Sequence, residues 1–255
     1  MDILLVERGL AESRAQAQRL VMAGQVRVDD QLVLKSSATV LPDARIRIER
    51  GPRFVSRGGE KLEAALNRFA LTVSGKICAD LGASTGGFTD CLLQHGATKV
   101  YAIDVGKGIL HWKLRQNPQV VVMENTNARY INQLPEPVQI VTVDASFISL
   151  KVLLPVICGW FPSEGGEAVG LIKPQFEAGR SQVARGEGVI RDSAVHYQVL
   201  MDVLNAAQQE GYEVRDLMRS PLLGPKGNVE FFVYLVYPQA RVVELDQLIG
   251  DLIES

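Results

Sequence analysis

The chain has 255 residues, of which 47% are hydrophobic, and its formal net charge at pH 7 is −2. This length allows one or two domains with a buried core. The near balance of charge excludes a chain that attracts nucleic acid through a positive field over its whole surface. The balance is uneven, because residues 1–61 hold 11 Lys and Arg against 8 Asp and Glu. This asymmetry permits a polyanion-binding N-terminal part.

Three cysteines are spread along the chain without a CxxC pair: Cys78, Cys91 and Cys158. Their odd number and wide spacing argue against a disulfide framework and a zinc site, and are typical of a reducing compartment. The longest apolar run, 152–161, is broken by Pro155 and Gly159 and is too short to span a bilayer. Residues 1–8 contain no signal-peptide apolar region. We therefore expect a cytoplasmic protein that neither enters a membrane nor holds a metal ion.

Residues 1–49 are predicted to form a small α+β domain. Its first helix places Ile3, Leu4 and Leu10 at roughly helical spacing. The second begins after Ser13, whose hydroxyl can cap it, and ends at Gly24. Its apolar stripe is Ala17, Leu20 and Val21.

Strands follow these helices. Alternation of apolar and polar residues about Asp29-Asp30 predicts a hairpin, and the strict alternation of "ARIRIER" (44–50) predicts a further strand. Such a short unit has a thin core, so we expect it to depend on its neighbour or on its function. Residues 50–57 are predicted to be a linker.

Residues 58–255 alternate between strand and helix signals, which predicts an α/β fold with a mainly parallel sheet covered on both faces. The predicted strands are 77–81, 100–103, 120–123, 140–143, 168–172, 212–217 and 230–237. The clearest helices are 88–94, 150–158 and 193–210. The turn-rich link "SPLLGPKGN" before the last strand is too short for a helical crossover, so this strand should be antiparallel.

The loop "ADLGASTGGFTD" (79–90) joins a predicted strand to a helix and is rich in glycine. Its spacing does not match the G-x-G-x-x-G of dinucleotide sites, and Phe88 stands where a P-loop needs Lys-Ser/Thr. An acidic residue before Leu-Gly-x-x-x-Gly-Gly suits S-adenosylmethionine, which has a carboxylate and a ribose but no phosphate. The candidate cofactor-binding residues of this loop are Asp80, Gly82, Ala83, Ser84, Gly86, Gly87 and Phe88.

Two further candidates for this cofactor follow the next two strands. Asp104 lies about 20 residues beyond the loop, where a carboxylate can accept hydrogen bonds from ribose hydroxyls. Asn127, in Asn125-Thr126-Asn127, could meet the adenine edge.

Charged residues stand at the ends of four separate elements. Asp144 and Lys173 each follow a parallel strand, and ligands of open α/β sheets bind beyond such carboxyl ends. Glu230 opens the last strand, and Lys61 lies on a helix that precedes the first. A single Lys or Glu at a strand end is usually solvated or half of a salt bridge. The shared position of Asp144 and Lys173 favours a site.

Five motifs make the chain resemble a known family: "SRGGEKL" (56–62), "DLGASTGGFTD", "DASFISL", "KPQFE" and "GPKGNVEF". They are similar to those of FtsJ/RrmJ-type ribose 2′-O-methyltransferases, and in particular of the TlyA subgroup, often labelled hemolysin A. The first 50 residues are similar to the RNA-binding domain of small-subunit ribosomal protein four. The resemblance implies a class I, Rossmann-like methyltransferase sheet of seven strands with the last antiparallel.

The same resemblance implies a reaction and its residues. It implies that S-adenosylmethionine methylates ribose 2′-hydroxyls of cytidines in ribosomal RNA, with a catalytic tetrad of Lys61, Asp144, Lys173 and Glu230. A lysine that faces Lys61 and a sulfonium is favoured in its neutral form, so Lys173 could take the proton of the hydroxyl. If Lys173 stays charged, it could instead orient the oxygen. Asp144 and Glu230 would position the two amines.

The expected partner is ribosomal RNA or a ribosomal subunit. The candidate phosphate contacts are Arg14, Arg19, Arg27 and Arg57, followed by Arg8 and Lys35. The chain begins almost directly on its first predicted helix, without the basic leader of subgroup members that modify both subunits. We therefore expect a large-subunit target.

Three other functions are weighed against this one. A membrane-active hemolysin would need a signal, a spanning segment or a long basic amphipathic helix, none of which the sequence offers. A non-catalytic RNA-binding protein would have no use for all four charged residues of the tetrad. A nicotinamide-dependent dehydrogenase is disfavoured by the glycine spacing.

Overall fold

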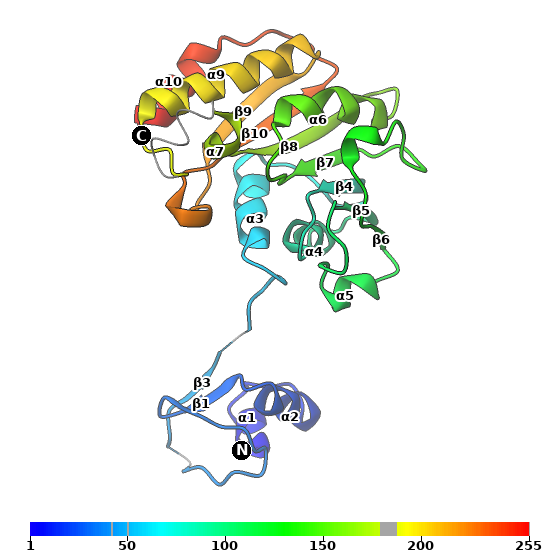
Figure 1. Ribbon diagram of the computed structural model, residues 1–255. Coiled ribbons are helices and arrows are strands. Elements are labelled where there is room, and N and C mark those ends of the chain that lie inside the picture. The colour runs from blue at the N-terminus through cyan, green and yellow to red at the C-terminus, as the bar shows by residue number, and fades with distance from the viewer. Residues whose placement is uncertain (42, 50, 179–187, 255) are drawn as a thin grey trace. The chain divides into compact units, whose positions relative to one another are not determined.

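The structure is a computed structural model that describes residues 1–41, 43–49, 51–178 and 188–254. The chain divides into two compact units, Met1–Arg53 and Phe54–Ser255 (Figure 1). The division lies inside the segment 50–57 predicted as a linker, of which Arg50 is outside the described residues. Within the described ranges, no helix combines the length and hydrophobicity that crossing a membrane requires.

The smaller unit packs two helices against a three-stranded sheet. Its elements are α1 (Asp2–Glu7), α2 (Arg14–Met22), β1 (Val26–Val28), β2 (Gln31–Leu32) and β3 (Ile46–Ile48), with the antiparallel order β2-β1-β3. The Ser13 hydroxyl accepts a hydrogen bond from the Gln16 amide and caps α2, as predicted. Asp29 and Asp30 both have positive φ, as the turn of a two-residue hairpin requires.

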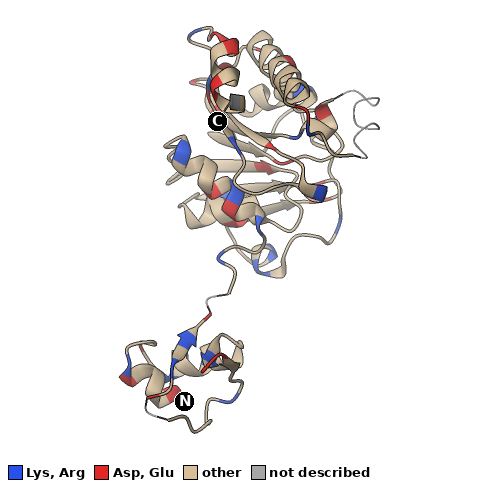
Figure 2. Ribbon diagram, turned by 90° about the vertical axis from the view of Figure 1, so that its left-hand side faces the viewer, with Lys and Arg blue, Asp and Glu red and all other residues tan. Residues whose placement is uncertain are grey.

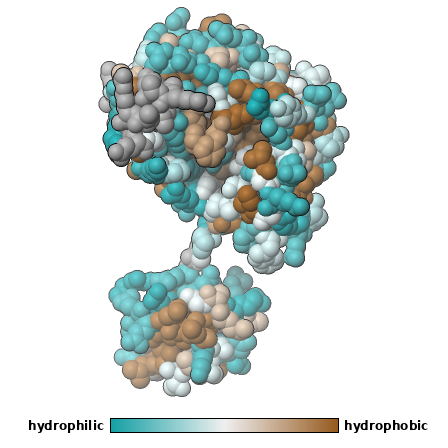
Figure 3. Space-filling view, viewed as in Figure 1, coloured by the Kyte–Doolittle hydropathy of each residue, from teal (hydrophilic) through white to brown (hydrophobic). Residues whose placement is uncertain are grey.

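The apolar stripe expected on the first helix is wrong. Leu5, rather than its neighbours, is fully buried against Ala17 and Val21 of α2, whereas Ile3 is 51% exposed. Helix α1 ends at Glu7, so Leu10 lies outside it and the helical spacing that the sequence suggested does not extend that far. Figure 3 shows the exposed hydrophobic surface of this small unit in brown.

The larger unit contains one seven-stranded sheet. Its strands are β4 (Ile77–Leu81), β5 (Lys99–Ile103), β6 (Val120–Met123), β7 (Ile140–Val143), β8 (Gly166–Ile172), β9 (Glu213–Arg219) and β10 (Phe231–Tyr237). Their order is β6-β5-β4-β7-β8-β10-β9, and β10 runs antiparallel to both β8 and β9. The predicted fold class and the antiparallel last strand are confirmed.

Helices cover both faces of this sheet, as Figure 1 shows. They are α3 (Gly58–Arg68), α4 (Gly87–Gln94), α5 (Trp112–Arg115), α6 (Leu150–Ile157), α7 (Pro174–Glu177), α9 (Ser193–Gln209) and α10 (Leu245–Glu254), with single turns η1 (Ala128–Tyr130), η2 (Cys158–Trp160) and η3 (Pro225–Gly227). Side chains that alternate along each strand fill the cores on its two faces. One core contains residues of α6, α9 and α10, another contains residues of α3 and α4, and a smaller one contains Leu114 of α5.

The C-terminal helix α10 has no counterpart among the predicted elements. Its buried Leu245 and Ile249 are one turn apart and pack into the core beside α9. The helical spacing of these two residues is visible in the sequence, but the strand–helix alternation that indicates the other elements ends at β10.

Candidate functional site

A cavity of ≈ 270 Å³ opens at the carboxyl ends of the central parallel strands, next to the start of α3. All four predicted tetrad residues line it: Lys61, Asp144, Lys173 and Glu230. The glycine loop contributes Gly82, Ala83, Ser84, Gly87 and Phe88, and Arg57 stands at the beginning of α3. Residues that are as much as 169 positions apart therefore meet in one space.

Lys61 and Glu230 form a buried ion pair. The Lys61 Nζ donates to Glu230 Oε2 at 2.6 Å, and neither side chain is more than 7% exposed. Helix α3 presents Lys61 one residue before Leu62, which is fully buried in the core of the unit. Removing one partner of such a pair leaves a buried, uncompensated charge, which typically destabilises a protein by about 3–5 kcal/mol.

Two residues outside the predicted set fix the carboxylate of Glu230. Gln175, on α7, donates its Nε2 to Glu230 Oε1 at 3.3 Å. A Cβ atom at Gly224 would lie 2.0 Å from the same oxygen, so the carboxylate occupies the space that a side chain would need. Both residues belong to motifs singled out in the sequence, "KPQFE" and "GPKGNVEF", but nothing in their spacing indicates contact with Glu230.

The second ion pair joins Lys173 to Asp144. Lys173 Nζ lies 2.6 Å from Asp144 Oδ1 and donates to Ser146 Oγ at 3.2 Å. Pro174 begins α7 directly after Lys173 and ends the strand there. Burial of the carboxyl group raises the pKa of Asp144, although the Lys173 charge opposes this shift. The site thus holds two amines and two carboxylates within one cavity.

A second cavity of ≈ 450 Å³ lies beside the first and shares Gly82, Ser84 and Asp144 with it. The predicted cofactor residues Asp104 and Asn127 line it. Apolar walls come from several elements: Leu81, Ile103, Val105, Ile148 and Leu153. A space with apolar walls and a few polar groups is typical of a small-molecule site.

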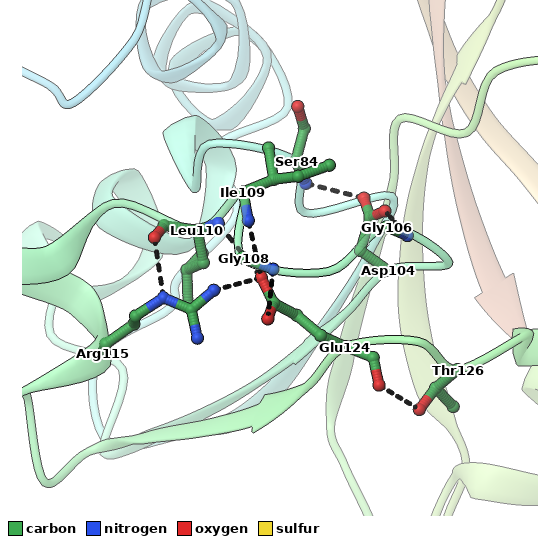
Figure 4. Close-up of polar contacts among 9 residues, drawn as sticks. All are labelled: Ser84, Asp104, Gly106, Gly108, Ile109, Leu110, Arg115, Glu124 and Thr126. Carbon is green, nitrogen blue, oxygen red and sulfur yellow. Dashed lines mark hydrogen bonds and ion pairs between the residues drawn. The ribbon is translucent and has the colours of Figure 1, made fainter.

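Asp104 is held by the backbone around it. Its Oδ2 accepts from the Ser84 amide at 2.8 Å and its Oδ1 from the Gly106 amide at 2.7 Å (Figure 4). A carboxylate oxygen can accept more than one hydrogen bond, so both oxygens retain capacity for ligand hydroxyls.

Gly82 lines both cavities and lies where a side chain would not fit. Its φ is +78°, and a Cβ atom there would lie 2.6 Å from the Asp144 carbonyl oxygen. The turn after β4 therefore approaches the end of β7 more closely than any other residue would allow.

Two predicted cofactor residues lie elsewhere. Asp80 is fully buried in β4 and lines neither cavity. Its carboxylate accepts hydrogen bonds from Thr89 of α4 and Thr142 of β7, so it ties the glycine loop's helix to the sheet. Gly86 also lines neither cavity, because it packs against Leu110 and Leu114. The assignment of these two residues to the cofactor stays a prediction.

The arginines predicted to contact RNA differ in their surroundings. In the smaller unit, Arg14 is paired with Asp2 at 3.1 Å and Arg27 with Glu49 at 2.7 Å, while Arg19 is exposed on α2. Figure 2 shows basic and acidic residues interspersed along this unit. Among the residues that the structure describes, no group of three His, Cys, Asp or Glu could hold a metal ion.

Two families of known proteins match the chain. The FtsJ-like methyltransferase family matches residues 54–237, a range that includes both cavities. The S4 domain family matches residues 1–46. The two matches fall on the two compact units.

Individual proteins agree with these matches. The 16S/23S rRNA (cytidine-2′-O)-methyltransferase TlyA of Mycobacterium tuberculosis is 44% identical over 241 residues, 92% of this chain and 88% of the relative. The 23S rRNA (cytidine-2′-O)-methyltransferase TlyA of Campylobacter jejuni is 36% identical over 183 residues, 72% and 71% of the two chains. A solved structure named "Putative hemolysin from Streptococcus thermophilus" is 40% identical, with a TM-score of 0.76, and covers 99% of this chain and 93% of that chain.

Proposed function

Because the chain belongs to the FtsJ-like methyltransferase family, we propose that it transfers the methyl group of S-adenosylmethionine to ribose 2′-hydroxyls of cytidine in ribosomal RNA. The convergence of Lys61, Asp144, Lys173 and Glu230 on one cavity beside the glycine loop is the observation that carries this proposal. The relatives named above act on ribosomal RNA at this position of cytidine. The names of both relatives include 23S rRNA, so the large-subunit RNA is the favoured target.

The second cavity fits S-adenosylmethionine in its chemistry. The Asp104 carboxylate suits the ribose hydroxyls, Asn127 suits the adenine edge, and the apolar walls suit the adenine ring. The ribose and adenine would lie here, with the reactive end toward the shared residues Gly82 and Asp144. When bound, the cofactor supplies an activated methyl group on a positively charged sulfur.

The protein must align the ribose oxygen with that methyl group and ease the loss of one proton. Alignment can supply about 7–11 kcal/mol in favourable cases. We assign Lys173 to the reacting hydroxyl, because its amine contacts Asp144, which lines both cavities, and Ser146, which lines the second cavity. In its neutral form Lys173 takes the hydroxyl proton, and in its charged form it orients the oxygen lone pair.

The two carboxylates hold the amines in place. Asp144 fixes Lys173, and Glu230 fixes Lys61 while Gln175 and Gly224 fix Glu230. Lys61 and Lys173 thus line the same cavity, each held by its own carboxylate. We assign the initial capture of RNA to Arg14, Arg19 and Arg27 of the smaller unit and to Arg57 at the cavity.

The experiment that tests this function maps methylated riboses in ribosomal RNA. RNA from a strain lacking the protein is compared by mass spectrometry with RNA from the strain complemented with wild-type protein, Lys173→Ala or Lys151→Ala. Lys151 is a matched control on α6 that lines neither cavity. We expect wild type and Lys151→Ala to restore one cytidine 2′-O-methyl group, and Lys173→Ala to lower the rate about 10²–10⁴-fold.

Calorimetry with S-adenosylmethionine shows whether Lys173→Ala is folded, since this variant should still bind the cofactor. Near-wild-type methylation by Lys173→Ala would refute the role of this lysine. Ribosomal RNA that is identical with and without the wild-type protein would refute the function itself.

A further inference from the structure

We propose that residues 105–113, the loop after β5 together with the start of α5, form a second RNA-binding surface, on the methyltransferase unit itself, with Trp112 as a platform for an unpaired base. This inference rests on the proposed function, because it takes RNA as the substrate. Charge, exposure, rigidity and the position of the loop each support it.

The sequence around this loop is locally basic. Residues 105–123 contain Lys107, Lys113 and Arg115 and not a single Asp or Glu, in a chain whose acidic residues outnumber its basic ones. Arg115 is neutralised by an ion pair with Glu124. Lys107 and Lys113 are exposed, and neither side chain has an ion pair within the described part of the chain. Two unpaired cations therefore flank the centre of the loop, where phosphates could bind.

The same loop exposes large apolar side chains. Trp112 is 66% exposed, and Val105 and Ile109 are exposed beside it in the sequence. Figure 3 shows hydrophobic patches between hydrophilic ones on the visible face of the larger unit. An exposed tryptophan between two lysines suits a nucleic acid better than an apolar protein surface, because the ring can stack on a base while the ammonium groups meet the backbone.

A single carboxylate makes this exposed loop rigid. Glu124 accepts hydrogen bonds from the backbone amides of Gly108, Ile109 and Leu110, and it pairs with Arg115. Arg115 in turn donates its Nε to the Leu110 carbonyl at 3.0 Å, as Figure 4 shows. The Arg115 guanidinium and then these amides lower the pKa of Glu124 to about 2. A loop held in this way loses little conformational freedom when it binds.

The loop also adjoins the cofactor cavity. Val105 lines that cavity, and the Gly106 amide donates to Asp104, the carboxylate assigned to the ribose of the cofactor. An RNA strand whose target ribose enters the tetrad cavity would therefore pass near the loop. Trp112 would stack on the base of a neighbouring nucleotide rather than on that of the methylated one.

The test measures the affinity of the full-length protein for two probes, a fluorescein-labelled single-stranded oligoribonucleotide and large ribosomal subunits from a strain lacking the protein. The variants are Trp112→Ala and Lys107→Ala/Lys113→Ala. The control, Arg68→Ala/Arg241→Ala, removes two exposed cations that line neither cavity and are paired with Asp216 and Glu213. All lie on the surface, and unchanged cofactor binding by calorimetry verifies the fold.

We expect Trp112→Ala to weaken binding of both probes about 5- to 150-fold, the range of single base–aromatic stacks. The double lysine variant should reduce the slope of log affinity against log salt by about 0.7 for each lost phosphate contact on single strands. The control should bind like wild type. Wild-type affinity of both loop variants, or a loss on subunits with none on the oligoribonucleotide, would overturn the proposal, since the latter indicates a ribosomal protein contact. Wild-type methylation of ribosomal RNA, measured alongside, separates the two hypotheses. If wild type methylates the RNA while either of these outcomes is found, the role of the loop is refuted and the proposed function stands.

Discussion

Asp80, one of the predicted cofactor residues, joins the glycine loop's helix to the sheet. It opens the Asp-Leu-Gly stretch of the glycine loop, but the structure buries it completely between Thr89 and Thr142. Burial raises the pKa of its carboxyl group to about 7, against the two threonine hydrogen bonds that oppose the shift. The folded protein therefore favours the protonated group far more than the unfolded chain does.

A pH dependence of stability follows from this preference. Since the folded pKa of about 7 lies above the usual 3.8, the contribution to stability is complete at acid pH and is lost as pH rises from the lower value through the higher one. A difference of one between the folded and unfolded pKa corresponds to about 1.4 kcal/mol. Asn cannot ionise, so the Asp80→Asn variant should not show this loss of stability. Its melting temperature should therefore fall less between pH 5 and 8 than that of wild type.

Calorimetric scans across this pH range check the prediction. Asp202→Asn makes the same chemical change on the exposed face of α9 and serves as the control. Parallel curves for wild type and Asp80→Asn would show that Asp80 does not titrate as its burial requires.

At the scale of elements, the link between β9 and β10 positions Glu230 in the tetrad cavity. It contains η3 and returns the chain so that Glu230 enters the cavity at the start of β10. The Gly224 amide donates to the Asn228 carbonyl, and Asn228 holds the Ile190 amide and the Gly188 carbonyl. The carboxylate of Glu230 then rests against Gly224.

Gly224→Ala should therefore impair catalysis and also lower the stability of the fold. The φ of Gly224 is −71°, which alanine adopts freely, but the new Cβ would displace Glu230 from its contacts with Lys61 and Gln175. We expect the turnover number to fall about 10-fold or more, because misplacement of about 1 Å can cost 10²-fold. The melting temperature should also fall, because strain on the buried Lys61–Glu230 pair costs stability.

Gly250→Ala provides the matched control. Gly250 lies inside α10, and a Cβ atom added there would face open space, with no atom of the described residues within 4 Å. This change should stabilise the helix by about 0.8–1 kcal/mol and leave turnover unaltered. Equal turnover in the two variants would mean that Glu230 need not be held where it lies.

At the scale of the whole molecule, we propose that the two units divide the work that RNA methylation requires. Across the described ranges, both cavities are lined only by residues of the larger unit. The smaller unit has a core of its own, built around Leu5, Ala17, Val21 and Val26, and it matches a known domain family separately.

Deleting residues 1–49 should accordingly spare the cofactor and weaken RNA binding. We expect calorimetric affinity for S-adenosylmethionine to remain near that of wild type. Affinity for ribosomal RNA should fall, and the salt dependence should flatten by about 0.9 in log–log slope for each phosphate contact that is lost from paired regions. Binding of RNA with unchanged affinity and slope would contradict this division of labour.

The sequence alone was sufficient for the fold class. The strand–helix alternation, the glycine spacing and the carboxylate about 20 residues later are local patterns. They can be recognised in the sequence because each reflects a requirement of the local backbone. The motifs also identified the family, and with it the four charged residues of the cavity. Helix α10 was missed although its spacing is regular, because no neighbouring pattern required a further element.

Which groups touch was decided only by the tertiary structure. Lys61 meets Glu230 across 169 positions, and Lys173 meets Asp144, and no sequence spacing encodes either choice. The burial that raises the pKa of Asp80 and the rigid loop around Glu124 also arise only when distant strands come together. Ion pairing, desolvation and close approach depend on distances in space, and the fold sets those distances.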